Sequence, residues 1–151
     1  MKKFVVMLLA CLMIASCACA DTVYDFNLYA SIFGASEVKD GSESTIDGQE
    51  IQDFTSDDCR IVFASKDGKL KSIIVVGIGD KFLAYCASAI MQFDKSSENR
   101  TANYGNFLSL YLLSLNDDET SDDHMFTTVS GDACGIKKNG SKCQFTIVSL
   151  K

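Results

Sequence analysis

The chain contains no proline and only one histidine among its 151 residues. Without proline there is no Pro-rich linker, and no stretch of the sequence looks like a hinge between two domains. A length of 151 residues is ordinary for one domain, so we predict a single domain. With His124 as the only histidine, few catalytic sites that depend on imidazole are open to this chain.

Basic side chains are also scarce. Without Lys2 and Lys3, which lie in the N-terminal segment described next, 12 basic side chains remain against 20 acidic ones, a formal charge of −8. Nucleic-acid binding needs a basic surface for phosphate contacts, so we exclude that class of function. Anionic lipid headgroups are disfavoured for the same reason. A cationic partner is compatible with this charge, but most acidic exported domains have none.

Residues 1–20 have the pattern of an export signal. Lys2 and Lys3 provide the positive start, an apolar run from residue 4 to residue 15 follows, and Ala18-Cys19-Ala20 offers small residues to signal peptidase. The apolar run is shorter than the ~20 residues that span a bilayer, so we expect no transmembrane span in the mature chain. We therefore expect a domain of residues 21–151 that is periplasmic or secreted.

A second interpretation of the same segment stays open. Ile14-Ala15-Ser16-Cys17 resembles a bacterial lipobox, in which Cys17 would be lipidated and become the new N-terminus. This alternative predicts a membrane-anchored lipoprotein with an unchanged folded domain. We favour cleavage after Ala20, which would release the domain.

The centre of the chain predicts a β-hairpin. Residues 59–65 and 71–76 are rich in β-branched and aromatic side chains, which suit a half-buried sheet. Asp67-Gly68 between them favours a two-residue type I′ turn. That turn would pair Ile61 with Ile74 and place both side chains on one face of the hairpin.

A helix should follow the hairpin directly. Gly77-Ile78-Gly79 interrupts the strand, and Asp80 is a suitable N-cap because its carboxylate can accept bonds from backbone N–H groups. From there an apolar stripe recurs at helical spacing, formed by Phe82, Cys86, Ala89, Ile90 and Phe93. This stripe should fold back onto the sheet.

Two further helices are expected on either side of this unit. Residues 24–33 fit a helix that ends at Gly34, with Phe26, Tyr29, Ile32 and Phe33 on its apolar face. Residues 104–115 are apolar almost throughout, and their leucines favour a helix that is buried on most sides, after a polar loop at 95–103. If that helix were exposed, it would form a surface for a partner.

The remaining segments predict strands. Asp47-Gly48 could turn a small hairpin, with residues 50–54 as an edge strand. Residues 124–130 and 142–149 indicate two more strands around a turn-rich segment at 131–141.

The cysteines suggest a disulfide framework. Cys11, Cys17 and Cys19 lie in the export segment, which leaves Cys59, Cys86, Cys134 and Cys143 in the domain. An even number of cysteines in an exported domain favours disulfides. Three pairings are open, and we favour Cys59–Cys86 and Cys134–Cys143.

Together these elements predict an α+β fold. We expect a single small domain with an antiparallel sheet of about four to five strands in two hairpins, packed by two to three helices and crosslinked by two disulfides.

No catalytic or metal-binding set can be assembled from the sequence. His124 follows Asp122 and Asp123, which could orient it as a base, but no nucleophile can be assigned to it. The acidic loop at 116–123 lacks the spacing of an EF-hand, and Gly77-Ile78-Gly79 lacks the third glycine of a dinucleotide-binding turn. We predict no catalytic residue, no metal site and no cofactor.

These observations favour an exported, non-catalytic bacterial protein. It would be a small binding, inhibitory or interaction module with a protein or small-molecule partner that the sequence does not identify. Two alternatives remain: a small secreted hydrolase that uses His124, and a lipid-anchored structural protein of the envelope.

Overall fold

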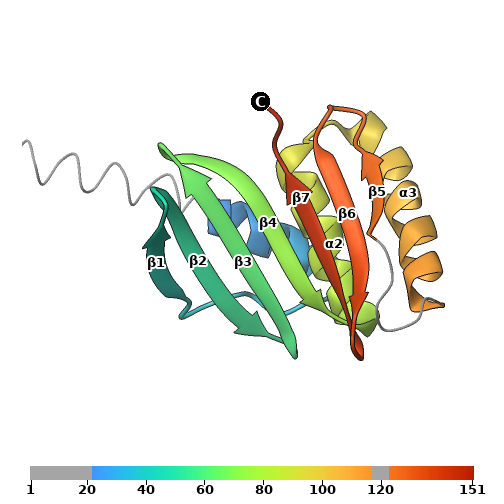
Figure 1. The fold of residues 1–151 in the computed structure, drawn as a ribbon, viewed down its shortest axis with the longest axis horizontal. Coiled ribbons are helices and arrows are strands. Elements are labelled where there is room, and N and C mark those ends of the chain that lie inside the picture. The colour runs from blue at the N-terminus through green and yellow to red at the C-terminus, as the bar shows by residue number, and fades with distance from the viewer. Residues whose placement is uncertain (1–21, 117–122) are drawn as a thin grey trace, which may run out of the picture.

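A computed structural model of the chain describes residues 22–116 and 123–151. It contains one seven-stranded antiparallel sheet in the order β1-β2-β3-β4-β7-β6-β5, with helices packed on one of its faces (Figure 1). After an N-terminal helix that is helical over residues 22–32, the elements are β1 Ser42–Ile46, β2 Gln49–Ser56, β3 Cys59–Lys66, β4 Lys69–Gly77, α2 Gly79–Phe93, α3 Ser97–Leu115, β5 His124–Thr127, β6 Ala133–Asn139 and β7 Lys142–Val148.

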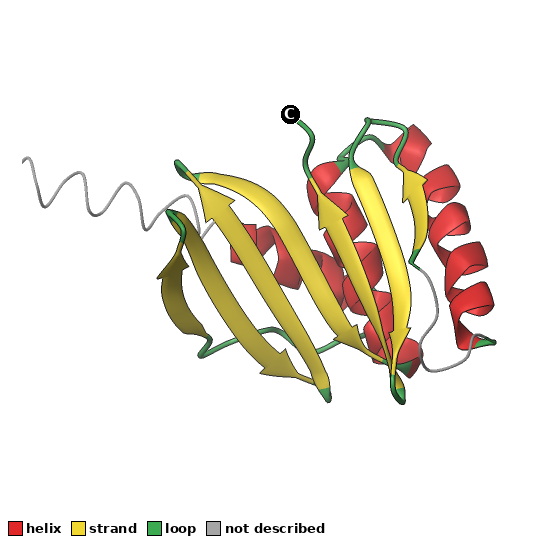
Figure 2. Cartoon of the chain, in the orientation of Figure 1, coloured by secondary structure: helices red, strands yellow, loops and turns green. Residues whose placement is uncertain are grey.

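The predicted α+β class and the antiparallel sheet are confirmed, but the sheet is larger than the four to five strands that we expected (Figure 2). The predicted export segment with Cys17, and the acidic loop apart from its ends Asn116 and Asp123, lie outside the described residues. Within residues 22–116 and 123–151, none of the helices combines the length and the hydropathy needed to cross a bilayer.

Short turns connect the first four strands. At Asp47-Gly48 and at Asp67-Gly68 both residues have positive φ angles, as a type I′ turn requires. Both turns were expected from the sequence. A third turn of the same kind, Asp57-Asp58, joins β2 to β3 without any glycine. The first four strands therefore form a meander, in which β1 is the edge and β2 lies inside it.

The predicted register of the central hairpin is wrong by one residue. A bulge at Ala64 and Ser65 leaves Lys71 as an extra residue on β4, so Ile61 faces Val75 and not Ile74. Because successive side chains point to opposite faces, this shift changes which residues of β4 are buried. Val75 lies in the core and Ile74 lies on the other face.

The segment at 131–141 that we expected to be turn-rich contains strand β6. Its residues pair with β5 on one side and with β7 on the other. Gly135 and Asn139 are poor strand formers, so this strand depends on its neighbours more than on its own composition. Strand β7 also pairs with β4, which joins the two halves into one sheet.

Helix α2 begins and packs much as predicted. Phe82, Cys86 and Ala89 are buried against the sheet, but Asp80 is not the N-cap. Ile78 holds that position without a side-chain hydrogen bond, and Asp80 lies in the first turn, where a negative charge favours the helix dipole. The exposed N–H of Gly79 donates instead to the Tyr111 hydroxyl of α3, at 3.4 Å.

Helix α3 is longer and more exposed than predicted. It begins at Ser97, so the expected polar loop forms its first two turns. Only one stripe of this helix is buried, which includes Phe107 and Tyr111, whereas Leu112 and Leu113 are 60% and 53% exposed. The prediction of burial on most sides is therefore wrong.

The N-terminal helix ends as expected but packs differently. Gly34 has a φ of 77°, and the N–H of Ala35 donates to the carbonyl of Ala30 at 2.9 Å, which closes the last turn. Phe26 and Ala30 form the buried face, but Ile32 and Phe33, which we placed on it, are exposed.

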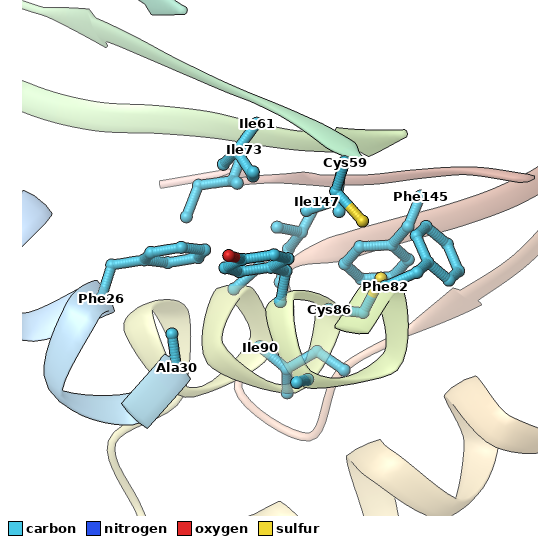
Figure 3. Packing of buried hydrophobic residues seen from close by; sticks show 14 of the residues in the cluster. Phe26, Ala30, Cys59, Ile61, Ile73, Phe82, Cys86, Ile90, Phe145 and Ile147 are labelled. Carbon is cyan, nitrogen blue, oxygen red and sulfur yellow. The ribbon is translucent and has the colours of Figure 1, made fainter. Parts of the chain in front are cut away.

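The core lies between the sheet and the helices. The ring of Phe26 in the N-terminal helix packs edge-to-face with Phe63 and stacks parallel to Tyr85 of α2. The distances between ring centroids are 5.0 Å and 6.0 Å. Figure 3 shows this layer from close by, with Phe26 and Phe82 from the helices and Ile73 and Phe145 from the strands all lying between the helices and the sheet. The rings of Phe107 in α3 and Phe145 in β7 also lie 5.0 Å apart between centroids. Aromatic contacts therefore join the N-terminal helix and α3 to the strands, and the N-terminal helix to α2.

The structure does not contain the two predicted disulfides, because all four cysteines of the domain are free and buried. Cys134 pairs with Ile147 and Cys143 with Lys138, so the two cysteines lie four residues apart along the ladder. That separation is about 13 Å, beyond the roughly 7 Å that a disulfide allows between Cα atoms. Cys59 of β3 and Cys86 of α2 both point into the core, but they are not bonded (Figure 3).

Candidate binding groove

The helices described in residues 22–116 and 123–151 leave one face of the sheet uncovered. Helices α2 and α3 pack on the face that carries the core, and the side chains that alternate with the core residues point the other way (Figure 1). The strand registers align these outward residues in rows. The middle row runs across five strands through Val62, Ile74, Thr146, Gly135 and Met125.

A groove of about 220 Å³ lies on this open face, over β5, β6 and β7. Ala133 and Gly135 of β6 form its floor, because their side chains are small or absent. Met125 of β5 lines one side and Thr146 and Val148 of β7 line the other. A strand with small outward residues between two strands with larger ones produces a trough along its length.

Gly135 has room for a side chain. A Cβ atom built on it would lie 3.9 Å from the carbonyl oxygen of His124 and 4.0 Å from Cγ of Met125, which are ordinary contact distances. The open volume of the groove therefore depends on the absence of a side chain at this position. Met125 is 69% exposed, so its flexible thioether chain is free to adjust to an occupant.

One end of the groove is charged. Lys137 of β6 lies 3.9 Å from the carboxylate of Asp123, and Gln144 of β7 pairs with Lys137 across the ladder. An exposed ion pair of this length contributes little to stability. Its two charges therefore remain available to polar groups of a partner, beside an apolar floor.

His124 does not belong to this groove. It lies at the start of β5 opposite the buried Ile136, so it belongs to the helix-facing side of the sheet. Asp123, one of the two acids that we considered as its partner, forms the ion pair with Lys137, and Asp122 lies outside the described residues. The hydrolase alternative therefore stays a prediction that depends on Asp122.

A second group of polar side chains is buried at the junction of α2, α3 and the loop before β6. The amide of Asn103 donates to Asp94 at 2.9 Å, and its oxygen accepts the N–H of Val129 at 2.9 Å. Burial acts to raise the pKa of Asp94, but the hydrogen bonds that it accepts, the strongest from Asn103, hold that pKa below its ordinary value of 3.8. We interpret this network as structural, because it connects three segments of the fold.

The cysteines gather in the core and do not form a reactive site. Burial, together with the nearby thiols of Cys59, Cys143 and Cys134, raises the pKa of Cys86 well above the ordinary value for a thiol. Burial also raises the pKa of Cys134 to about 12. Thiols with raised pKa values are poor nucleophiles at neutral pH. Across the described ranges 22–116 and 123–151, no three or more His, Cys, Asp or Glu side chains are grouped to hold a metal ion.

Comparisons of this chain with protein-family models, with curated proteins and with solved structures found no match. The groove itself is therefore the feature that indicates a function. Reasoning from the sequence missed the groove because it did not predict strand β6. The alternation of Ala133, Gly135 and Lys137 with the apolar Cys134 and Ile136 is the one signal that could have indicated it.

Proposed function

We propose that this chain is an exported, non-catalytic protein-binding module, and that the groove over β5–β7 receives an apolar anchor side chain of a partner protein. The observation that supports this proposal is an apolar trough, floored by Gly135, on the sheet face that the described helices leave uncovered. Interfaces often concentrate their binding energy in one or two anchors that fill such pockets.

The size of the groove favours a protein partner over a small molecule. Sites for small molecules usually enclose roughly 300–1,000 Å³, whereas this groove has about 220 Å³. That volume suits one or two side chains of a larger partner. The partner could then extend over the rest of the open face, where Val62 and Ile74 are half-buried and the exposed Arg60 is bound to Asp53.

The polar border supports the same interpretation. Asp123, Lys137 and Gln144 surround one end of the groove, so an apolar anchor would be followed by groups that can form hydrogen bonds. An apolar centre with a polar border is the usual arrangement of a protein interface. Export of the domain is inferred from residues 1–20.

A peptide library displayed on phage tests this proposal. We expect selection on the wild-type protein to enrich peptides that share an apolar residue at one position. The variant Ala133→Arg places a long side chain on the groove floor and should abolish their binding. Ser44→Arg, on the exposed edge strand β1, introduces the same side chain away from the groove and should leave binding intact.

Two results would refute the groove as the binding site. One is a selection that enriches no peptide above background on the wild-type protein. The other is a set of peptides that bind Ala133→Arg as well as they bind Ser44→Arg. If the exported protein showed a hydrolytic activity that His124→Ala removed, the secreted hydrolase would replace the binding module as the better explanation.

A further inference from the structure

The N-terminal helix carries a second apolar surface, which faces away from the core. Tyr24, Leu28 and Ile32 recur at intervals of four residues and are 70%, 51% and 66% exposed. Residues four apart lie on one side of a helix, so these three form a continuous stripe. Phe33 extends it at the end of the helix. Helices of globular proteins normally present polar residues to water on this side.

Charged groups of both signs border this stripe, and some of them form ion pairs. Lys95 lies 3.3 Å from Asp25, and Lys81 donates to the carbonyl of Gly34 at the end of the helix. Just beyond the helix, Lys39 pairs with Glu37 at 2.9 Å. Lys81 keeps its positive charge, because a carbonyl is neutral, and Asp40 and Glu43 beside Tyr24 are negative. Neither sign is in large excess around the stripe, which favours an apolar or zwitterionic partner over a strongly charged one.

The position of the helix in the chain indicates what the partner is. Cys17, in the segment that resembles a lipobox, precedes Thr22 by five residues. Each residue spans at most about 3.6 Å, so a lipid on Cys17 could lie no more than about 18 Å from the start of the helix. A bilayer that held the lipid would therefore be within reach of Tyr24, and the stripe would be the first apolar surface to meet it.

We propose that the lipobox interpretation of residues 14–17 holds in place of cleavage after Ala20, and that the stripe of Tyr24, Leu28 and Ile32 lies on the surface of a zwitterionic bilayer to which a lipid on Cys17 anchors the chain. Amphipathic helices bind membranes in this way by burying their apolar side at the boundary between headgroups and acyl chains. A formal charge of −8 on the chain without Lys2 and Lys3 argues against anionic lipids as the main attraction. The lipid provides attachment, and the stripe provides orientation.

This arrangement has a consequence for the open face of the sheet. The N-terminal helix lies on the same side of the sheet as α2, and the groove over β5–β7 lies on the opposite side (Figure 1). A bilayer against the helix would leave the open face directed toward the aqueous compartment. A partner could then reach the groove while the chain stays anchored.

The absence of tryptophan makes a direct test feasible, because any introduced tryptophan is the only one in the chain. The full precursor carrying Leu28→Trp is expressed in a bacterial host and recovered in its lipidated form. It is then reconstituted into phosphatidylcholine vesicles with brominated acyl chains. We expect a blue-shifted emission that the bromine atoms quench. The matched variant Thr55→Trp, exposed on the open face of the sheet, should be neither shifted nor quenched.

Four outcomes would overturn the proposal. The first is intact mass that shows a chain beginning at Asp21 without lipid. The second is Leu28→Trp emission that stays unquenched in the anchored protein, and the third is equal quenching of Thr55→Trp. The fourth is Leu28→Trp emission that shifts to the blue without vesicles, by an amount that grows with protein concentration. That result would show that the stripe binds a second copy of the chain. Ala133→Arg should not alter the quenching, so this test and the groove test can fail separately.

Discussion

Replacing Gly135 and Gly77 by alanine should change the free energy of unfolding in opposite directions. Gly135 forms the floor of the groove, and a Cβ atom there would meet nothing closer than 3.9 Å. Gly77 ends β4 beside the core, and a Cβ atom there would lie 2.5 Å from Sγ of Cys59 and 3.3 Å from Cβ of Phe82. Neither glycine has a positive φ angle, so the difference between them is one of space alone.

The magnitudes follow from known effects of each kind. Glycine within a strand costs about 0.5–1 kcal/mol relative to alanine, so Gly135→Ala should increase the free energy of unfolding by about that amount. An added methyl group in a close-packed site costs about 1–3 kcal/mol, so Gly77→Ala should reduce the free energy of unfolding despite the same gain in chain entropy. Urea denaturation measures both, provided the m-value does not change.

A double-mutant cycle tests whether the contact with Cys59 causes the destabilisation by Gly77→Ala. Replacing Cys59 by Ala removes the sulfur atom that the new methyl group would meet. In that background the cost of Gly77→Ala should fall by about 1 kcal/mol or more. Our reasoning fails if Gly135→Ala destabilises the protein by more than about 1 kcal/mol, because the groove floor would then have no free space. It fails equally if Gly77→Ala is neutral.

Four other predictions test the core. Asn103→Ala should lower the free energy of unfolding by about 1–3 kcal/mol in chemical denaturation, because the buried Asp94 loses a hydrogen-bond donor; an unchanged midpoint would contradict the network. Tyr85→Phe should cost about 1 kcal/mol in the same assay, since its hydroxyl lies 2.8 Å from the carbonyl oxygen of Ser36, and a stabilised variant would count against that bond. Because burial raises the pKa of Cys134 from 9.0 to about 12, unfolding should become easier as the pH rises from 9 toward 12, where the unfolded chain ionises this thiol first. A thiol reagent at pH 8 should modify the four domain cysteines only after unfolding, and rapid labelling of the native protein would be inconsistent with their burial.

Features that depend on a few neighbouring residues were predictable from the sequence. The turns at Asp47-Gly48 and Asp67-Gly68 follow from the ease with which these residues adopt positive φ angles. The buried stripe of α2 follows from apolar residues at helical spacing, and the end of the N-terminal helix follows from Gly34. In each case the chain itself supplies the cause within about four residues.

Features that depend on distant partners were not predictable. The bulge beside Ala64 exchanged Ile74 for Val75 in the core, and nothing within the hairpin indicates that extra residue. The two disulfides were wrongly predicted for the same reason. An even number of cysteines is compatible with disulfides, but only the register of β6 and β7 separates Cys134 from Cys143.

The amino-acid sequence by itself determined the class of the fold, most of the turns and helices, and the acidic charge that argues against nucleic acid as a partner. Only the tertiary structure decided which face of the sheet stays open, because the helices cover one side and leave the other to solvent. It also decided that Gly135 would form the floor of a groove and that Leu28 would lie on an exposed stripe. The physical reason is that exposure is a property of the neighbours that a residue acquires on folding, and most of those neighbours are far away in the chain.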